Sequence, residues 1–170
     1  AGLTTEQIAA MTTAQVNALS AAQAAGLTTA QLAAMETADL QALSTGTLRA
    51  LASDQIAALS SDQIQSLSTR QIAALSTTQV SELGTEELAA LSSNQVRALT
   101  SAQVGALTTA QVAAMETEDV AALSSAQLRA LGSDDIAALT TAQVVALGTA
   151  QVASLSTAQA AGLGTEQLAA

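Results

Sequence analysis

The octapeptide LTTEQIAA at residues 3–10 sets the architecture of the whole chain, because variants of it follow one another without a gap. A leucine or methionine recurs at every eighth residue from Leu3 to Leu163, through 21 successive octads whose average unit reads L-S/T-T-A-Q-V-A-A. An internal repeat of fixed short period is typical of a solenoid, in which each unit packs only on its neighbours. We therefore treat residues 1–170 as a single repeat domain.

Each octad carries the signals that begin a helix. In the first octad, Thr4 and Gln7 have the spacing of a capping box, in which each side chain accepts a hydrogen bond from the backbone amide of the other residue. Leu3 and Ile8 occupy the two positions of a hydrophobic staple, and alanine, the strongest helix former, extends the unit. Each octad is therefore predicted to form a short capped helix of about two turns.

Variations in the octad keep this register. Glu36, Ala52 and Glu116 depart from the preferred cap residues, and we expect them to weaken the local helix start without shifting the repeat. Glycine, which is a tolerated cap, replaces Ser/Thr at Gly84, Gly132, Gly148 and Gly164.

Two other arrangements of the octad fail on geometry. In one continuous helix, eight residues advance about 800°, so the apolar pair would shift by about 80° per octad and form no single stripe. In a strand, Leu3 and Ile8 would point to opposite faces. Because one short helix does not persist alone, we predict an all-α corkscrew solenoid with several octads in each coil. We expect Leu and Val/Ile in a central core, with Gln, Asp, Glu and Arg outside.

The composition excludes most chemical sites. The chain contains no Cys, His, Lys, Pro or aromatic residue, so the commonest general bases, nucleophiles and stacking platforms are absent. The net charge is −10, with 14 acidic residues against four arginines that are spread along the chain, whereas a nucleic-acid surface needs clustered basic charge. No apolar run approaches the roughly 18 residues that span a membrane. We predict no enzyme, no catalytic, cofactor or metal site, no nucleic-acid partner and no membrane insertion.

The string Ala-Leu-Thr-Thr-Ala-Gln occurs at residues 106–111 and 138–143, with near copies throughout. It resembles the ALTTAQ octapeptide tracts of large bacterial proteins that are often labelled adhesins or haem-utilisation proteins. The resemblance covers all 170 residues and implies an α-solenoid inside a long secreted or surface-attached chain. Haem ligation finds no support in the residues, because of the usual iron ligands only Met11, Met35 and Met115 are present, all in the buried Leu register.

A longer period overlies the octads and indicates superrepeats at residues 4–83 and 84–163. One interpretation is the duplication of a ten-octad block. The other is that 80 residues fit a whole number of coils, so that charges recur on one face. The features shared at this offset are Met35/Met115, Glu36/Glu116, Asp39/Asp119, Arg49/Arg129 and Asp54/Asp134.

The favoured hypothesis for function is a non-enzymatic spacer or stalk within a large bacterial extracellular or cell-surface protein. Its length would be set by the number of repeats. The alternative is a solenoid surface that binds a protein or peptide partner. Clustering of the variable side chains on one face would favour binding, and an even scatter would favour the spacer.

Three further expectations concern particular groups. The second hydroxyl of each Ser/Thr pair, such as Thr5 or Thr109, offers a regular array that would order water or ice. The acidic groups at 116–119 and 134–135 would bind a cation weakly, although helix-start electrostatics explain them as well. The chain starts and stops in mid-pattern without a targeting signal, so we expect a piece of a longer array whose exposed ends stack end to end.

Overall fold

Twenty-one short helices follow one another in the computed structural model, which describes residues 3–169; no strand occurs in that range. The all-α solenoid is therefore confirmed, although the helices have four to six residues rather than two full turns. The helices are α1 (Thr5–Ala9), α2 (Thr13–Asn17), α3 (Ala21–Ala25), α4 (Thr29–Ala33), α5 (Thr37–Ala42), α6 (Thr45–Ala50), α7 (Ser53–Ala57), α8 (Ser61–Ser66), α9 (Thr69–Ala74), α10 (Thr77–Ser81), α11 (Thr85–Ala89), α12 (Ser93–Ala98), α13 (Ser101–Val104), α14 (Thr109–Ala114), α15 (Thr117–Ala122), α16 (Ser125–Ala130), α17 (Ser133–Ala137), α18 (Thr141–Val145), α19 (Thr149–Val152), α20 (Thr157–Gly162) and α21 (Thr165–Leu168).

The capping box forms as predicted. Thr4 Oγ1 accepts a hydrogen bond from the Gln7 amide at 3.2 Å, and Gln7 Oε1 accepts one from the Thr4 amide at 2.8 Å. The helices headed by Glu36, Ala52 and Glu116 lack a bond from the cap side chain, yet they begin in register. The capping signal therefore recurs often enough for the repeat to tolerate single losses.

Each helix ends where the chain reaches the next Leu or Met. Leu43, for example, has φ −63° and ψ 135°, and the cap residue that follows it is also extended. The Leu43 amide still donates to the Leu40 carbonyl at 3.2 Å, which closes the last turn. No described residue has a positive φ, so the bend between octads needs no glycine.

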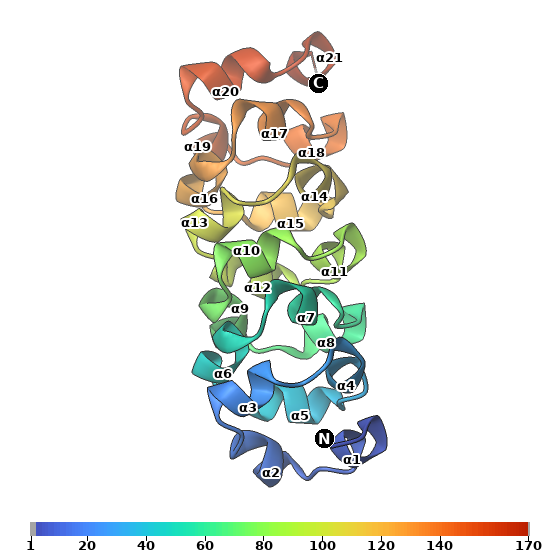
Figure 1. Cartoon of the computed structure of the whole chain (residues 1–170). Coiled ribbons are helices and arrows are strands. Elements are labelled where there is room, and N and C mark those ends of the chain that lie inside the picture. Colours follow the sequence, from blue (N-terminus) through green and yellow to red (C-terminus); the bar gives the residue numbers. More distant parts are fainter. Residues whose placement is uncertain (1–2, 170) are drawn as a thin grey trace.

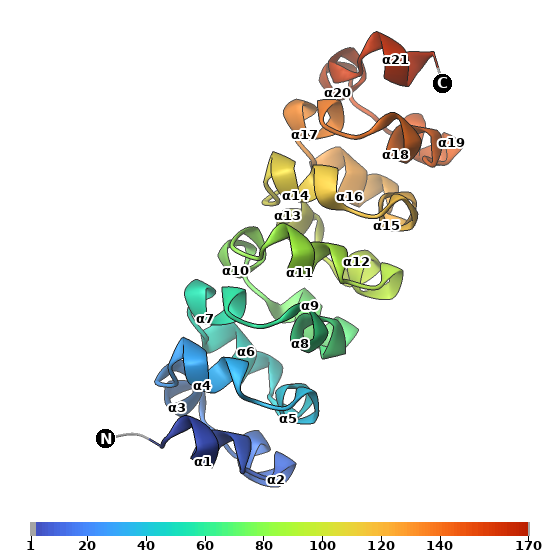
Figure 2. The same ribbon diagram turned by 90° about the vertical axis from the view of Figure 1, so that its right-hand side faces the viewer.

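The helices wind into one narrow superhelix (Figure 1). Each helix packs on the third one before it, as α6 does on α3 and α16 on α13. The chain passes from α6 on the left across α7 in front to α8 on the right as it climbs, and Figure 2 agrees with that order. The superhelix is therefore right-handed.

Ten octads complete three coils. Helix α1 packs on α4, α4 on α7, and α7 on α10. Helix α11, one octad further, is the one that lies above α1 in Figure 1, with α21 above both. Likewise α17 lies above α7. This geometry supports the second interpretation of the 80-residue period, because residues 80 apart lie on the same side of the superhelix.

The predicted apolar core is confirmed. The sixth residue of the octad is buried by no less than 98% from Ile8 to Ile136, and the Leu or Met position is at most 5% exposed from Met35 to Leu139. These side chains form one continuous cluster along the axis. Apolar burial of this kind is the main favourable contribution to folding.

Glutamine lies inside the superhelix, and its predicted place outside is wrong. Gln103 is 1% exposed. Its Nε2 donates to the carbonyls of Ile72 and Leu75 in the coil below, at 2.9 Å each, while its Oε1 accepts from the Thr100 amide at 2.7 Å. The physical reason is that carbonyls at a helix end have no partner within their own helix and would be buried unpaired.

The same bond recurs along the chain, and we call the set the glutamine ladder. In each member, Nε2 donates to the backbone carbonyl of the Leu or Met 28 residues earlier. The 13 members are Gln31, Gln55, Gln63, Gln71, Gln79, Gln95, Gln103, Gln111, Gln127, Gln143, Gln151, Gln159 and Gln167.

Candidate functional surface

Three acidic residues occupy ladder positions and bind a hydroxyl of the coil below. Ser93 Oγ donates to Asp119 Oδ1 at 2.7 Å, and Thr109 Oγ1 donates to Asp135 Oδ1 at 2.8 Å. Ser61 Oγ donates to Glu87 Oε1 at 3.4 Å. Each hydroxyl lies 26 residues before its acid, at the second position of a Ser/Thr pair. A carboxylate cannot donate to the carbonyl that glutamine binds, so these octads join the coil below through a hydroxyl instead.

Asp119 is the most perturbed of these acids. It is only 4% exposed, and burial raises the pKa of its carboxyl above the usual range. The hydrogen bond from Ser93 lowers the pKa in part, and the negative charge of Glu118 raises it further. Asp39 and Asp135 are buried as well, so the prediction that aspartate lies outside is wrong at these positions.

The two acidic groups singled out as cation candidates do not converge. In the group at 116–119, Glu116 and Glu118 are exposed whereas Asp119 turns into the superhelix. In the second group, Asp134 is exposed and Asp135 accepts from the Gly132 amide at 2.9 Å. Among residues 3–169, no group of three acidic side chains lies close enough together to hold a metal ion. Helix-start electrostatics explain the exposed acids, and the ladder explains the buried ones.

The second hydroxyls of the Ser/Thr pairs surround the superhelix. Helices on its left and right sides alike begin with such a residue, as α6 does with Thr45 and α11 with Thr85. Most of these hydroxyls are exposed, and three of them bind the acids described above. They form no single flat face, and the ice-binding hypothesis stays a prediction.

Charged side chains, in contrast, separate onto opposite sides. The helices on the left of Figure 1, α3, α6, α9, α13, α16 and α19, contain Arg49, Arg70 and Arg129 and no acidic residue. Arg97 ends α12, which packs on α9. We call these four exposed arginines the arginine side.

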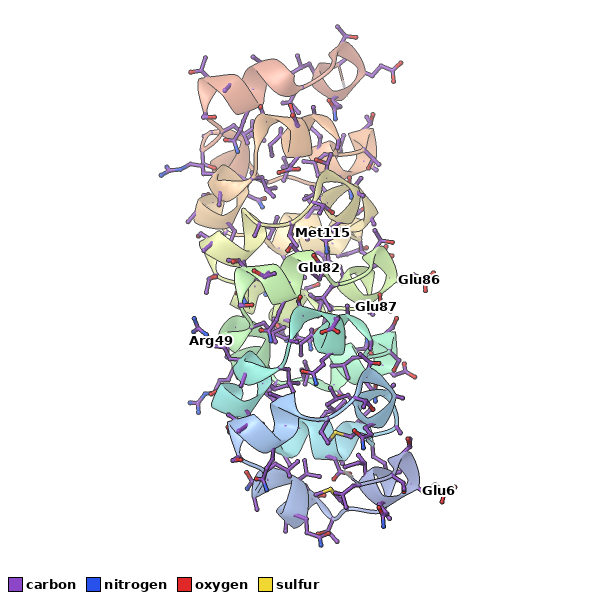
Figure 3. The ribbon with its side chains drawn as sticks, in the orientation of Figure 1. Glu6, Arg49, Glu82, Glu86, Glu87 and Met115 are labelled. Carbon is purple, nitrogen blue, oxygen red and sulfur yellow. The ribbon has the colours of Figure 1, made fainter. Side chains whose placement is uncertain are left out.

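The helices on the right of Figure 1 contain acids and no arginine; they are α1, α4, α8, α11, α14, α18 and α21. We call their fully exposed acids, Glu6, Asp62, Glu86 and Glu166, the acidic side. Figure 3 shows Arg49 pointing away from the axis on the left, and Glu6 and Glu86 pointing away on the right. The spacing of 80 residues between Glu6, Glu86 and Glu166 places them one above another.

This surface follows from a repeat that the chain shares with other proteins. The ALTTAQ repeat matches residues 1–35, 32–69, 80–117, 112–149 and 144–170. The chain belongs to the ALTTAQ repeat family. No curated protein matches it. In this ALTTAQ chain, the last residue of the motif is the ladder glutamine, and the second threonine supplies the hydroxyl that binds an acid of the next coil.

None of the described helices of this ALTTAQ chain is long and apolar enough to cross a bilayer. Its hollows lie at the ends of the superhelix. Two of them, of about 370 and 320 Å³, adjoin the last coil, and a third of about 220 Å³ adjoins the first coil.

Proposed function

We propose that this ALTTAQ chain is a non-enzymatic structural module that acts as a rigid spacer or stalk. The observation that carries the proposal is the glutamine ladder, which joins each coil to the one below it at most steps from Gln31 to Gln167. Beneath the ladder runs one continuous apolar core. Both features repeat with the octad, so each added octad extends the superhelix without changing its cross-section.

The rigidity of this module would come from the number of joints. A buried hydrogen bond contributes about 1 kcal/mol net, and leaving its partner unpaired costs about 1–3 kcal/mol. Bending the superhelix would open ladder bonds and expose core side chains on one side. The proposal includes the setting, a large secreted or surface-attached bacterial protein, on the strength of the resemblance of the octads to such tracts.

Small-angle X-ray scattering tests the spacer. The full chain would be compared with a variant that lacks residues 84–163, which joins Leu83 to Gly164 with the octad register intact. We expect the cross-section to stay constant while the length falls in proportion to the 90 residues that remain of 170. Scattering that follows the power law of a flexible chain would overturn the proposal.

Binding of a partner is the second candidate, and the separation of charges favours it. A module that acted only as a spacer would tolerate charges anywhere on its surface. Here the exposed acids Glu6, Glu86 and Glu166 lie above one another, opposite the arginine side. Such an arrangement steers a partner of complementary charge to one side. The partner that fits the acidic side is an extended, lysine-rich protein segment.

A lysine-rich peptide used as a probe tests this candidate. The matched variant carries E6Q, E86Q and E166Q together with A22E, A102E and A126E, which moves three acids to exposed sites at the same octad position on other helices. Its net charge is unchanged. If the acidic side binds the peptide, we expect the variant to bind more weakly at the same ionic strength. Equal binding by the two proteins would show that net charge alone acts.

A further inference from the structure

The two end faces of the superhelix differ from each other. At the first coil, the Leu and Met side chains are uncovered: Leu3 is 49% exposed, and Met11, Leu19 and Leu27 are partly exposed. They border the hollow of about 220 Å³. The sixth octad position is already buried there, as at Ile8. The Leu position therefore faces the preceding coil, and the sixth position faces the following one.

The last coil shows the opposite pattern. Val152, at the sixth octad position, is 48% exposed, and Leu168, at the same position two octads later, is 67% exposed. The neighbouring Val145 is 60% exposed. These side chains border the hollow of about 320 Å³, together with the partly exposed Leu155 and Leu163. The two faces are thus the two halves of the apolar contact that every internal coil makes.

The polar groups of the two faces are complementary as well. Gln7, Gln15 and Gln23 are exposed, and their Nε2 atoms donate to no described residue. At the other end, the carbonyls of Leu147, Leu155 and Leu163 accept from no glutamine of the described chain. Internal coils pair these same groups, as Gln159 Nε2 does with the Leu131 carbonyl at 2.8 Å. Three donors on one face correspond to three acceptors on the other.

Charge opposes such a contact only weakly. The chain carries a net charge of −10, but residues 3–27 contain Glu6 as their only acid, and residues 147–169 contain only Glu166. Neither segment contains an arginine. The faces that would meet are therefore among the least charged parts of the surface.

We propose that this chain binds a second copy of itself head to tail, the face of the first coil against the face of the last. The contact continues the coil-to-coil interface from one molecule into the next. Because the two faces differ, the contact is heterologous and leaves a free face at each end, so it extends into linear stacks rather than closing as a dimer. Two like faces would set glutamine donors against donors, or carbonyls against carbonyls.

Sedimentation velocity over a range of concentrations tests the proposal with three variants. The first, L3E/Q15E, alters the face of the first coil, and the second, V152E/L168E, alters the face of the last coil. The third, A102E/A126E, adds the same charge to the sides of the superhelix. All six residues are exposed, so we expect each variant to fold, and circular dichroism would check this.

The wild type and the side variant should form species that grow beyond the dimer as the concentration rises. Each end variant alone should stay a monomer, and an equimolar mixture of the two should double in mass and grow no further, because it contains one intact pair of faces. Dimers of either end variant alone would show contacts between like faces and overturn the proposal. A monomeric wild type up to about millimolar concentration, or equal loss of association in the side variant, would also overturn it. The shape measured on a monomeric end variant tests the spacer separately.

Discussion

Two adjacent octads show how the same backbone is held in two ways. In α14, Thr108 accepts from the Gln111 amide at 3.2 Å, and Gln111 donates to the Leu83 carbonyl of the coil below at 2.7 Å. In α15, Glu116 provides no cap bond, and Asp119 accepts from Ser93 instead of donating to a carbonyl. Both helices have six residues and the same buried sixth position.

The difference separates what forms the helix from what joins the coils. Helix α15 survives without a capping box, so the apolar core and the register suffice to place it. The joint beneath it is weaker in kind, because one hydroxyl bond replaces the carbonyl bonds of Gln111 and a buried carboxylate remains. We therefore expect stability to vary along the superhelix with the residue at the ladder position.

Removing the ladder bond at α14 is expected to have the largest effect. Gln111→Met keeps the length and apolar contacts of the side chain but leaves the Leu83 carbonyl and the Thr108 amide without partners. Unpaired buried groups cost about 1–3 kcal/mol each, so we expect a loss of about 2–4 kcal/mol in the free energy of unfolding. Chemical denaturation monitored by circular dichroism would measure it.

Gln15→Met is the matched control for that substitution. Gln15 caps its own helix at Thr12 but is exposed and donates to no coil below. We expect it to lose no more than about 1 kcal/mol, the usual value of a cap. If the two substitutions had equal effects, the ladder would contribute only through capping, and its role as a joint between coils would be wrong.

Restoring the ladder at α15 should act in the opposite direction. In Asp119→Gln, the amide would donate to the Leu91 carbonyl, the acceptor 28 residues earlier, and the buried negative charge would be removed. A net gain of about 1–2 kcal/mol is expected from one hydrogen bond and the relief of charge burial. A rise in the midpoint of thermal unfolding would confirm it. Unchanged stability would mean that the Ser93 hydroxyl already replaces the ladder bond in full.

The sequence predicted the repeating parts of this architecture because their signals are local. The Leu3 register, the box of Thr4 and Gln7 and the staple at Ile8 each involve residues within one octad. The inward direction of glutamine was missed because capping already explained its presence. A signal was available: glutamate serves a capping box equally well, yet it stands at this position only once, at Glu87, against 16 glutamines. That bias indicates a need for the amide donor.

The number of octads in a coil could not be derived locally, because it depends on how the bend at each Leu adds up over several units. The 80-residue offset of Arg49/Arg129 and Asp54/Asp134 was the only sequence signal that bore on it. Once ten octads are known to complete three coils, the separation of Glu86 from Arg49 follows from residue numbers. The separation of charge therefore had to await the structure.

A cap restored at α15 should produce a smaller gain than a restored ladder bond. Glu116→Ser supplies the hydroxyl that α14 has at Thr108, and we expect about 0.5–1 kcal/mol of added stability. Glu116→Ala is the control, since it removes the same charge without adding a cap. Equal gains from the two substitutions would assign the effect to relief of repulsion among Glu116, Glu118 and Asp119 rather than to capping.

The smallest change is expected from pH, because the Ser93 bond offsets part of the burial of Asp119. Burial raises the folded-state pKa of Asp119 above its value in the unfolded chain, so the ionised form destabilises the fold. That penalty is complete above the folded pKa and disappears as the pH falls below the unfolded pKa. The wild type should therefore gain stability relative to Asp119→Asn as the pH falls through the acid range, and the other acids cancel in this difference. In a Ser93→Ala background, the loss of the bond that lowers the pKa should move the change to higher pH. A stability difference that stays constant with pH in both backgrounds would show that Asp119 titrates alike in the folded and unfolded chains, and that the hydroxyl joint carries no buried charge.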